Sequence, residues 1–163
     1  MSSAAAGGTV REAIPSHNEE AEVATLGAVL IDPEALPAII ALVRPEDFYR
    51  GAHQRIFEAV LALFERGQSI DLITVTEELR SRAALEQCGG SAYVSRLTSA
   101  VPTSANVEYY ARIVQAASIR RTLAKVSREI SIQAHDESTQ IQVILEEAER
   151  RIFEISDRNQ TGT

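Results

Sequence analysis

The stretch of sequence that decides the fold runs from residue 104 to residue 134 and reads SANVEYYARIVQAASIRRTLAKVSREISIQA. It contains neither Gly nor Pro, and its apolar residues recur mostly at spacings of three and four. A helix of this length would span about 45 Å. After a short polar turn at residues 135–138 a second such stretch begins, with the apolar residues Ile141, Ile144, Leu145, Ala148, Ile152 and Ile155. We therefore expect an antiparallel hairpin of two long amphipathic helices over residues 104–158.

Upstream of the hairpin, residues 18–103 carry the signals of several shorter helices. Predicted starts are Asn18, Asp32 with Pro33, the capping-box spacing Thr74–Glu77, and Ser91; predicted stops are Pro45, a left-handed Gly67, and Pro102. A helix over residues 53–66 should point Ile56, Phe57, Val60, Leu61 and Phe64 inward, and Phe48 and Tyr49 should anchor the core. No stretch predicts a strand, so the expected fold is all-α: a compact helical head followed by the long hairpin.

The composition excludes several classes of protein. The length of 163 residues suits one domain, and a single cysteine, Cys88, rules out an intrachain disulfide and favours a reducing cytoplasm. Lys125 is the only lysine and no glycine-rich loop precedes it, so the phosphate-binding loop of nucleotide hydrolases is missing. No apolar run approaches the roughly 20 residues of a membrane span, and no signal peptide is present, so we expect no membrane partner.

The two ends of the chain are expected to lie outside the folded core. Residues 1–17 are small and polar, with Gly7, Gly8 and Pro15, and this composition predicts a flexible tail. Residues 159–163 follow the last apolar residue of the hairpin.

Charge is unevenly divided along the chain. The formal net charge is −7, and residues 1–103 hold eight basic and fourteen acidic side chains, whereas the rest holds eight and nine. The head therefore carries most of the negative charge, which repels phosphate backbones and favours a basic protein partner.

No catalytic or metal-binding residue stands out. The three histidines, His17, His53 and His135, share no metal-ligand spacing. His53 lies at a predicted helix start, where we expect it to cap or pack. Cys88 lies beside Gly89 and Gly90 without an identifiable base and is interpreted as an incidental thiol. We predict no catalytic residue, no metal site and no cofactor.

Two charged clusters leave alternatives open. Glu19, Glu20 and Glu22 could form an acid pair, a divalent-ion site or a docking surface, but acids at a helix start need no function. The arginine pairs 120–121 and 150–151 could meet nucleic acid, yet solvation or ion pairing with Glu129, Glu146 and Glu147 explains them as well.

Several blocks of sequence, taken in order, resemble the N-terminal domain of the bacterial replicative helicases of the DnaB family. The blocks are Glu20-Ala21-Glu22 with Leu26-Gly27, Asp47-Phe48-Tyr49, His53 with Ile56-Phe57, Ile70-Asp71-Leu72-Ile73-Thr74, Gly89-Gly90 with Tyr93, Pro102-Thr103-Ser104-Ala105-Asn106, and Tyr110-Ala111-Arg112-Ile113-Val114. They cover about residues 15–158 at the family's spacing. Ala28 departs from the pattern, since many members have a second glycine there.

The resemblance implies a collar domain without catalysis, in which hairpins pair into dimers and three dimers form a hexameric ring. It implies docking of the primase C-terminal domain, with the primase-facing positions on Glu20 and Tyr93, and in some bacteria of a helicase loader. Self-association is expected through Ile141, Ile144, Leu145, Ala148 and Ile152 of the hairpin.

The resemblance also implies a longer parent protein, an ATP-dependent 5'-3' DNA helicase of the bacterial cytoplasm. Its ATP, Mg²⁺ and single-stranded DNA would be bound only with a motor domain beyond Thr163, so residues 159–163 would begin a linker. Two alternatives remain: a free-standing helical adaptor that shares the fold, and a small metal-dependent enzyme using the acids around Glu20.

Overall fold

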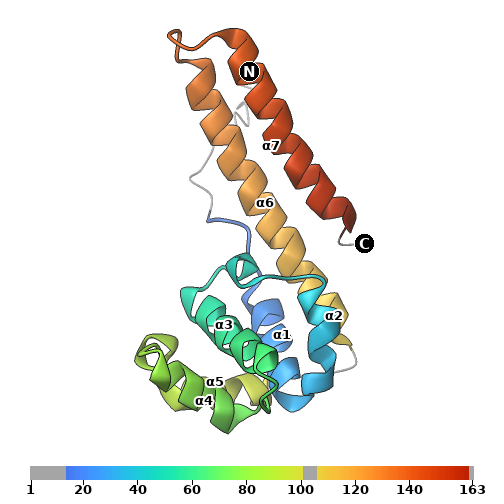
Figure 1. Ribbon diagram of the computed structural model, residues 1–163, viewed down its shortest axis with the longest axis vertical. Coiled ribbons are helices and arrows are strands. Elements are labelled where there is room, and N and C mark those ends of the chain that lie inside the picture. Colours follow the sequence, from blue (N-terminus) through green and yellow to red (C-terminus); the bar gives the residue numbers. More distant parts are fainter. Residues whose placement is uncertain (1–13, 101–105, 162–163) are drawn as a thin grey trace, which may run out of the picture.

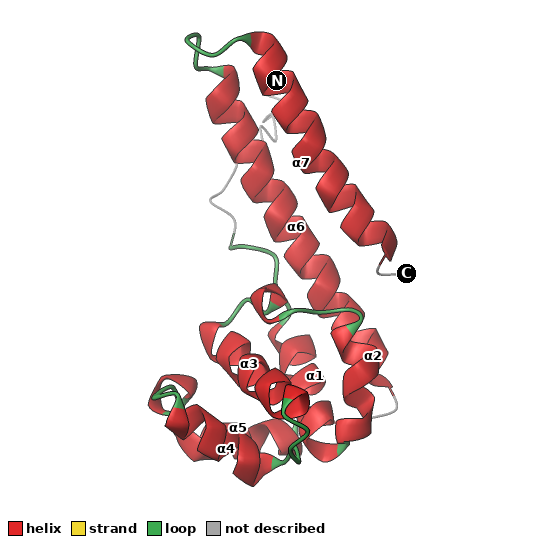
Figure 2. Cartoon of the chain, in the orientation of Figure 1, coloured by secondary structure: helices red, strands yellow, loops and turns green. Residues whose placement is uncertain are grey.

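The computed structural model describes residues 14–100 and 106–161. This part of the chain consists of α-helices and short 3-10 helices with no strand, which confirms the all-α prediction. In order the elements are α1 Glu19–Ile31, η1 Pro33–Ala35, α2 Leu36–Ile40, η2 Pro45–Asp47, α3 Gly51–Glu65, α4 Leu72–Ser81, η3 Glu86–Cys88, α5 Gly90–Ser99, α6 Val107–Ala134 and α7 Ile141–Thr161. Helices α1 to α5 form the head, and α6 and α7 form a hairpin that rises from it (Figure 1, Figure 2).

Helix α1 is the centre of the head. All of its residues from 24 to 30 are buried, and it packs against α3, α5 and α6. The first turns of α6 complete the same core through Val107, Ala111 and Val114. The first helix of the hairpin is therefore packed into the core of the head.

Among the residues that the structure describes, no single helix is long and apolar enough to cross a membrane. Helix α1 and the segment Pro33–Ile40 meet the length and composition of a span only together, and the chain bends by 118° between them.

Two predicted helix boundaries are confirmed by their hydrogen bonds and backbone angles. The Asn18 side chain accepts a hydrogen bond from the Ala21 N–H at 2.9 Å and caps α1. Gly67 follows α3 with a φ of +67°, a conformation that glycine adopts without a steric penalty.

Other predicted boundaries are wrong because a neighbouring residue satisfies the helix end better. Asp71, not Thr74, caps α4: its carboxylate accepts from the Thr74 N–H at 2.8 Å, and the Thr74 hydroxyl accepts from the Asp71 N–H at 2.9 Å. Gly89, with a φ of +89°, precedes α5, so Ser91 already lies inside the helix.

The helix expected between Pro33 and Pro45 is shorter than predicted. Asp32 caps it, through a hydrogen bond from the Glu34 N–H, but the segment begins as η1 and its α-helix ends at Ile40. Pro45 opens η2 rather than closing a helix. Phe64 was expected to point inward and is 45% exposed, because Leu63 takes the inward position on α3 at 3%.

The hairpin is observed as predicted, with different ends. Helix α6 begins at Val107 and α7 continues to Thr161, into the segment expected to begin a linker. In the turn, hydrogen bonds from the hydroxyls of Ser138 and Thr139 lower the pKa of Asp136 below its ordinary value of 3.8. The predictions for Pro102, for the sequence block before Asn106 and for residues 1–13 fall outside the described residues.

Candidate functional site

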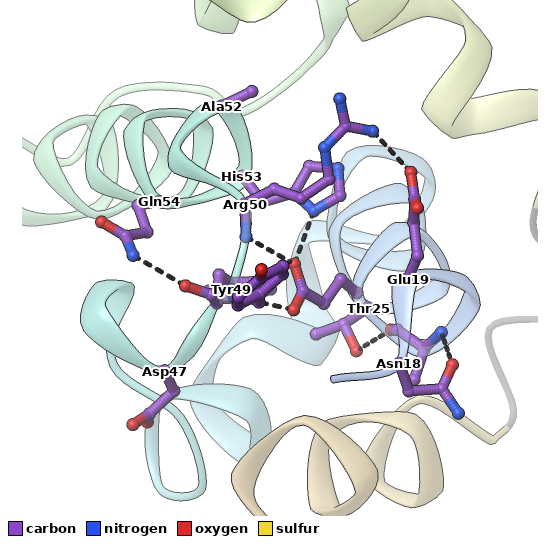
Figure 3. Close-up of polar contacts among 12 residues, drawn as sticks. Asn18, Glu19, Thr25, Asp47, Tyr49, Arg50, Ala52, His53 and Gln54 are labelled. Carbon is purple, nitrogen blue, oxygen red and sulfur yellow. Dashed lines mark hydrogen bonds and ion pairs between the residues drawn. The ribbon is translucent and has the colours of Figure 1, made fainter. Parts of the chain in front are cut away.

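A buried carboxylate lies at the centre of the head. Glu22 projects from α1 and is only 1% exposed. Its Oε2 accepts a hydrogen bond from the Tyr49 N–H at 2.8 Å, and its Oε1 faces the Arg50 N–H at 3.4 Å (Figure 3). Glu22 therefore holds the turn between η2 and α3 against α1, and it is not part of an exposed acidic cluster.

His53 continues this network toward the surface. It has no exposed area, and its Nδ1 lies 2.7 Å from Glu22 Oε1. Its Nε2 lies 2.6 Å from the Tyr93 hydroxyl, and the two rings stack with centroids 5.9 Å apart. Four of the family-like sequence blocks, those of Glu22, Tyr49, His53 and Tyr93, thus meet at one place.

Above this network lies a charged and aromatic surface. Tyr93 is partly exposed on α5, and the Arg50 guanidinium carbon lies 5.9 Å from its ring centroid. Arg50 also binds Glu19 of α1, with Nη1 2.5 Å from Oε1. Burial raises the pKa of the Tyr93 hydroxyl above its ordinary value, and the positive charge of Arg50 opposes that shift.

Glu20 lies on the same helix but faces a different set of neighbours. It is exposed, and with Glu19 it lines a pocket of about 270 Å³ whose other lining residues include Val23, Ala24 and Tyr110. The structure connects Tyr93 to Glu19 through Arg50, and Glu20 extends that surface along α1. We call Glu19, Glu20, Arg50 and Tyr93 the α1–α5 surface.

A second buried carboxylate joins the head to the hairpin. Asp47 has no exposed area and accepts hydrogen bonds from the Arg44 N–H at 2.7 Å and the Ser118 hydroxyl at 2.7 Å. Arg158, near the end of α7, places Nη2 at 2.5 Å from Asp47 Oδ2. Arg121 of α6 donates to the backbone carbonyl of Asp47 at 2.6 Å. Both hairpin helices are therefore tied to the same turn of the head.

Tyr49 was expected in the core and instead lies at the surface. It is 39% exposed, and His17 stacks on it with ring centroids 4.3 Å apart. The Arg121 guanidinium lies 5.5 Å from the same ring and also donates to the Ser16 carbonyl. Ser16 and His17, expected in a flexible tail, thus contact the folded domain.

The hairpin residues predicted to self-associate fall into two groups. Ile144 is buried against α6 at 6% exposure. Ile141, Leu145 and Ile152 are 65%, 48% and 41% exposed, and Ala148 is half-buried between them. Leu123, an apolar residue of α6, is also 44% exposed.

The remaining candidate groups have structural partners. Arg150 pairs with Glu147 and Arg151 pairs with Glu129, which confirms two of the expected ion pairs. Arg150 also pairs with Glu154, and Glu146 instead accepts a hydrogen bond from Gln142. Cys88 is buried, which raises the pKa of its thiol. The described residues include no group of three or more His, Cys, Asp and Glu that could hold a metal ion.

Sequence reasoning missed the roles of Glu22 and Asp47. The sequence did contain one indication that Glu22 is buried. Glu22 lies four residues before Leu26, so the two side chains share the apolar face of α1. For Asp47 the partners are Ser118 and Arg158, far along the chain, and no local pattern indicates them.

Known proteins have sequences similar to this one. A family model described as the DnaB-like helicase N terminal domain matches residues 14–116. The replicative DNA helicase DnaB of Geobacillus stearothermophilus is 48% identical over 151 residues, which cover 93% of this chain and 33% of that protein. The replicative DNA helicase DnaB of Treponema pallidum is 47% identical, with 92% and 34% covered. The chain spans about a third of the length of these curated relatives.

Solved structures share the fold. The crystal structure of the N-terminal domain of DnaB helicase from Mycobacterium tuberculosis matches with a TM-score of 0.82 and 34% identity, over 86% of this chain and 99% of that one. The structure of a DnaB-like replicative helicase and its interactions with primase matches with a TM-score of 0.70 and 26% identity, over 85% of this chain and 31% of that one. What the chain matches is the helicase's N-terminal domain, which lacks the ATPase motor. The chain belongs to the DnaB-like helicase N-terminal domain family.

Proposed function

We propose that this chain is the collar domain of a replicative DNA helicase, which assembles with copies of itself into a ring and docks the C-terminal domain of primase. Its parent is an ATP-dependent 5'-3' helicase of the bacterial cytoplasm. ATP, Mg²⁺ and single-stranded DNA are bound with the rest of that parent, and catalysis does not occur in this chain. A helicase loader is a further partner of the same domain in some bacteria.

The observation that carries this proposal is an uncovered apolar stripe on α7. Ile141, Leu145, Ala148 and Ile152 recur at spacings of four, three and four, so they share one face of the helix. Three of these four side chains are more than 40% exposed. A continuous exposed apolar face of this kind marks a protein contact, and a second hairpin is the matching surface.

Sedimentation equilibrium of the 163-residue chain tests self-association. Leu145→Asp and Ile152→Asp should lower the dimer fraction, because each puts a charge into the apolar contact while replacing a side chain that is exposed in the monomer. Ile73→Asp is the matched control, since Ile73 is 73% exposed on α4 of the head. Ile144→Asp is unsuitable because it would disrupt the hairpin itself. A dimer fraction that neither hairpin variant lowers contradicts the proposed contact.

The α1–α5 surface supports the docking half of the proposal. Glu19 and Glu20 present acidic groups beside an aromatic ring on a head with excess negative charge. Glu20→Lys and Tyr93→Ala should both weaken binding to the cognate primase C-terminal domain, measured by biolayer interferometry, while the circular dichroism spectrum stays unchanged. Unchanged affinity in both variants would remove this site assignment.

A further inference from the structure

The Tyr93 hydroxyl is held from inside the protein by one hydrogen-bond partner, and the residue is only partly buried. Tyr93 is partly exposed, and His53 is the only hydrogen-bond partner of its hydroxyl within the described residues. A tyrosine hydroxyl can donate one hydrogen bond and accept others. Whether the Tyr93 hydroxyl can donate to a docked protein or only accept from it therefore depends on whether it donates to His53 or accepts from it.

The interior of the network fixes the direction of the hydrogen bond between Glu22 and His53. Glu22 lies in the first turn of α1, where the helix end favours negative charge, and both of its oxygens face backbone N–H groups. A carboxylate can only accept hydrogen bonds, so the hydrogen atom between Glu22 and His53 is bonded to His53 Nδ1. The His53 ring is fully buried among Glu22, Phe48 and Tyr93.

An uncharged ring that carries its hydrogen on Nδ1 has a bare Nε2. At 2.6 Å from the Tyr93 hydroxyl such a nitrogen can only accept, and the Tyr93 O–H of that arrangement donates inward. Tyr93 then donates to His53, and His53 donates to Glu22. Successive hydrogen bonds that point in the same direction polarise and strengthen one another. The outer side of the Tyr93 oxygen is left with lone pairs and no hydrogen.

We propose that Glu22 and His53 are positioning residues that fix Tyr93 as a hydrogen-bond acceptor, so that the α1–α5 surface recognises an arginine or lysine side chain of the docked protein. The Glu20 carboxylate on the same surface is also an acceptor. The polar atoms of a guanidinium or ammonium group are all donors, so such a group can bind to either acceptor. This inference rests on the proposed docking function for the identity of the partner, but the state of His53 is a property of this chain alone.

Nitrogen-15 NMR of the chain with labelled histidine tests the relay without any partner. The chain has three histidines, and the signals that disappear in His53→Gln belong to His53. At neutral pH we expect His53 to carry hydrogen on Nδ1 and none on Nε2. Tyr93→Phe should shift the His53 Nε2 signal, whereas Tyr109→Phe, at a 64% exposed position on α6, should leave it unchanged. A ring with hydrogen on Nε2, alone or together with Nδ1, overturns the proposal.

Glu22→Gln separates positioning from simple packing. Glutamine fills the same space but can also donate, so His53 should become a mixture of its two tautomers while the chain stays folded. A His53 that keeps a single Nδ1–H tautomer in this variant contradicts the role of Glu22. If the variant does not fold, the Tyr93→Phe comparison still decides the proposal.

Binding to the primase C-terminal domain tests the recognition step. Removing one hydroxyl by Tyr93→Phe should weaken binding roughly three- to tenfold, the range expected for one hydrogen bond, and Tyr109→Phe should not change it. The effect should vanish when the contacting arginine or lysine of primase is replaced by methionine. Wild-type binding that Tyr93→Phe does not alter overturns this inference, whereas no wild-type binding at all refutes the docking function and leaves the NMR result standing.

Discussion

Replacing Asp47 by alanine tests whether one buried carboxylate ties the hairpin to the head. The side chain has no exposed area and accepts from Arg44, Ser118 and Arg158. The change removes all three interactions and leaves the Ser118 hydroxyl and the Arg44 N–H without their acceptor. The Arg121 contact survives because it uses the backbone carbonyl of Asp47.

The size of the loss can be worked out from these contacts. A hydrogen bond to a charged acceptor contributes about 1.5 kcal/mol or more, which applies to Arg44 and Ser118. The Arg158 side chain keeps 23% of its area exposed and can turn to water, so its pair counts for about 1 kcal/mol. Asp47→Ala should therefore lower the free energy of unfolding by about 3–4 kcal/mol.

Urea unfolding followed by circular dichroism at the helical band measures this loss. Arg158→Gln should cost about 1 kcal/mol and should speed hydrogen exchange in the last turns of α7. Glu46→Ala is the matched control, because Glu46 is an exposed acid next to Asp47 and its loss should cost less than about 0.5 kcal/mol. The reasoning fails if Asp47→Ala is no more destabilising than Glu46→Ala.

Two further predictions concern backbone conformation and pH. Gly89→Ala should lower the free energy of unfolding by about 2–3 kcal/mol, since φ is +89° and the new Cβ would lie 2.8 Å from Tyr93 Cβ. Gly67→Ala, with φ of +67° and no such contact, should cost only about 1 kcal/mol, so equal losses in urea titrations of the two variants would contradict the predicted clash. Hydrogen bonds from Arg66 and then Arg82 lower the pKa of Glu78 below 4.5, so Glu78 stabilises the fold above pH 4.5, and this contribution is lost as the pH falls through the lowered folded-state value. In acid titrations of stability, Glu78→Gln should flatten this part of the profile by up to about 1 kcal/mol, and an unchanged profile would show that the ion pairs contribute nothing.

Much of the fold could be predicted because its signals are local. The absence of Gly and Pro between residues 104 and 134, with the apolar spacing on both sides of the turn, was enough for the hairpin. The start of α4 could not be predicted because the sequence contains two possible capping boxes. In one, Asp71 caps the helix and Thr74 completes the box; in the other, Thr74 caps it and Glu77 completes the box. Local sequence cannot choose between them, and the structure uses the first.

The candidate site could be predicted only in part. Order and spacing of the sequence blocks were sufficient to place the family, whereas the docking roles of Glu20 and Tyr93 stay predictions. The burial of Glu22 and Asp47 depends on partners from other helices, such as His53 and Arg158. A carboxylate near a helix start or in a turn is ordinarily solvated, so only the packed structure distinguishes these two from their exposed neighbours.

The proposed docking function is tested most directly by isothermal titration calorimetry of the 163-residue chain with the C-terminal domain of primase from the same organism. We predict a saturable heat of binding that weakens as salt is raised, because acidic groups of the α1–α5 surface meet a basic partner. Absence of heat at high micromolar concentration, with both proteins folded, would contradict the account.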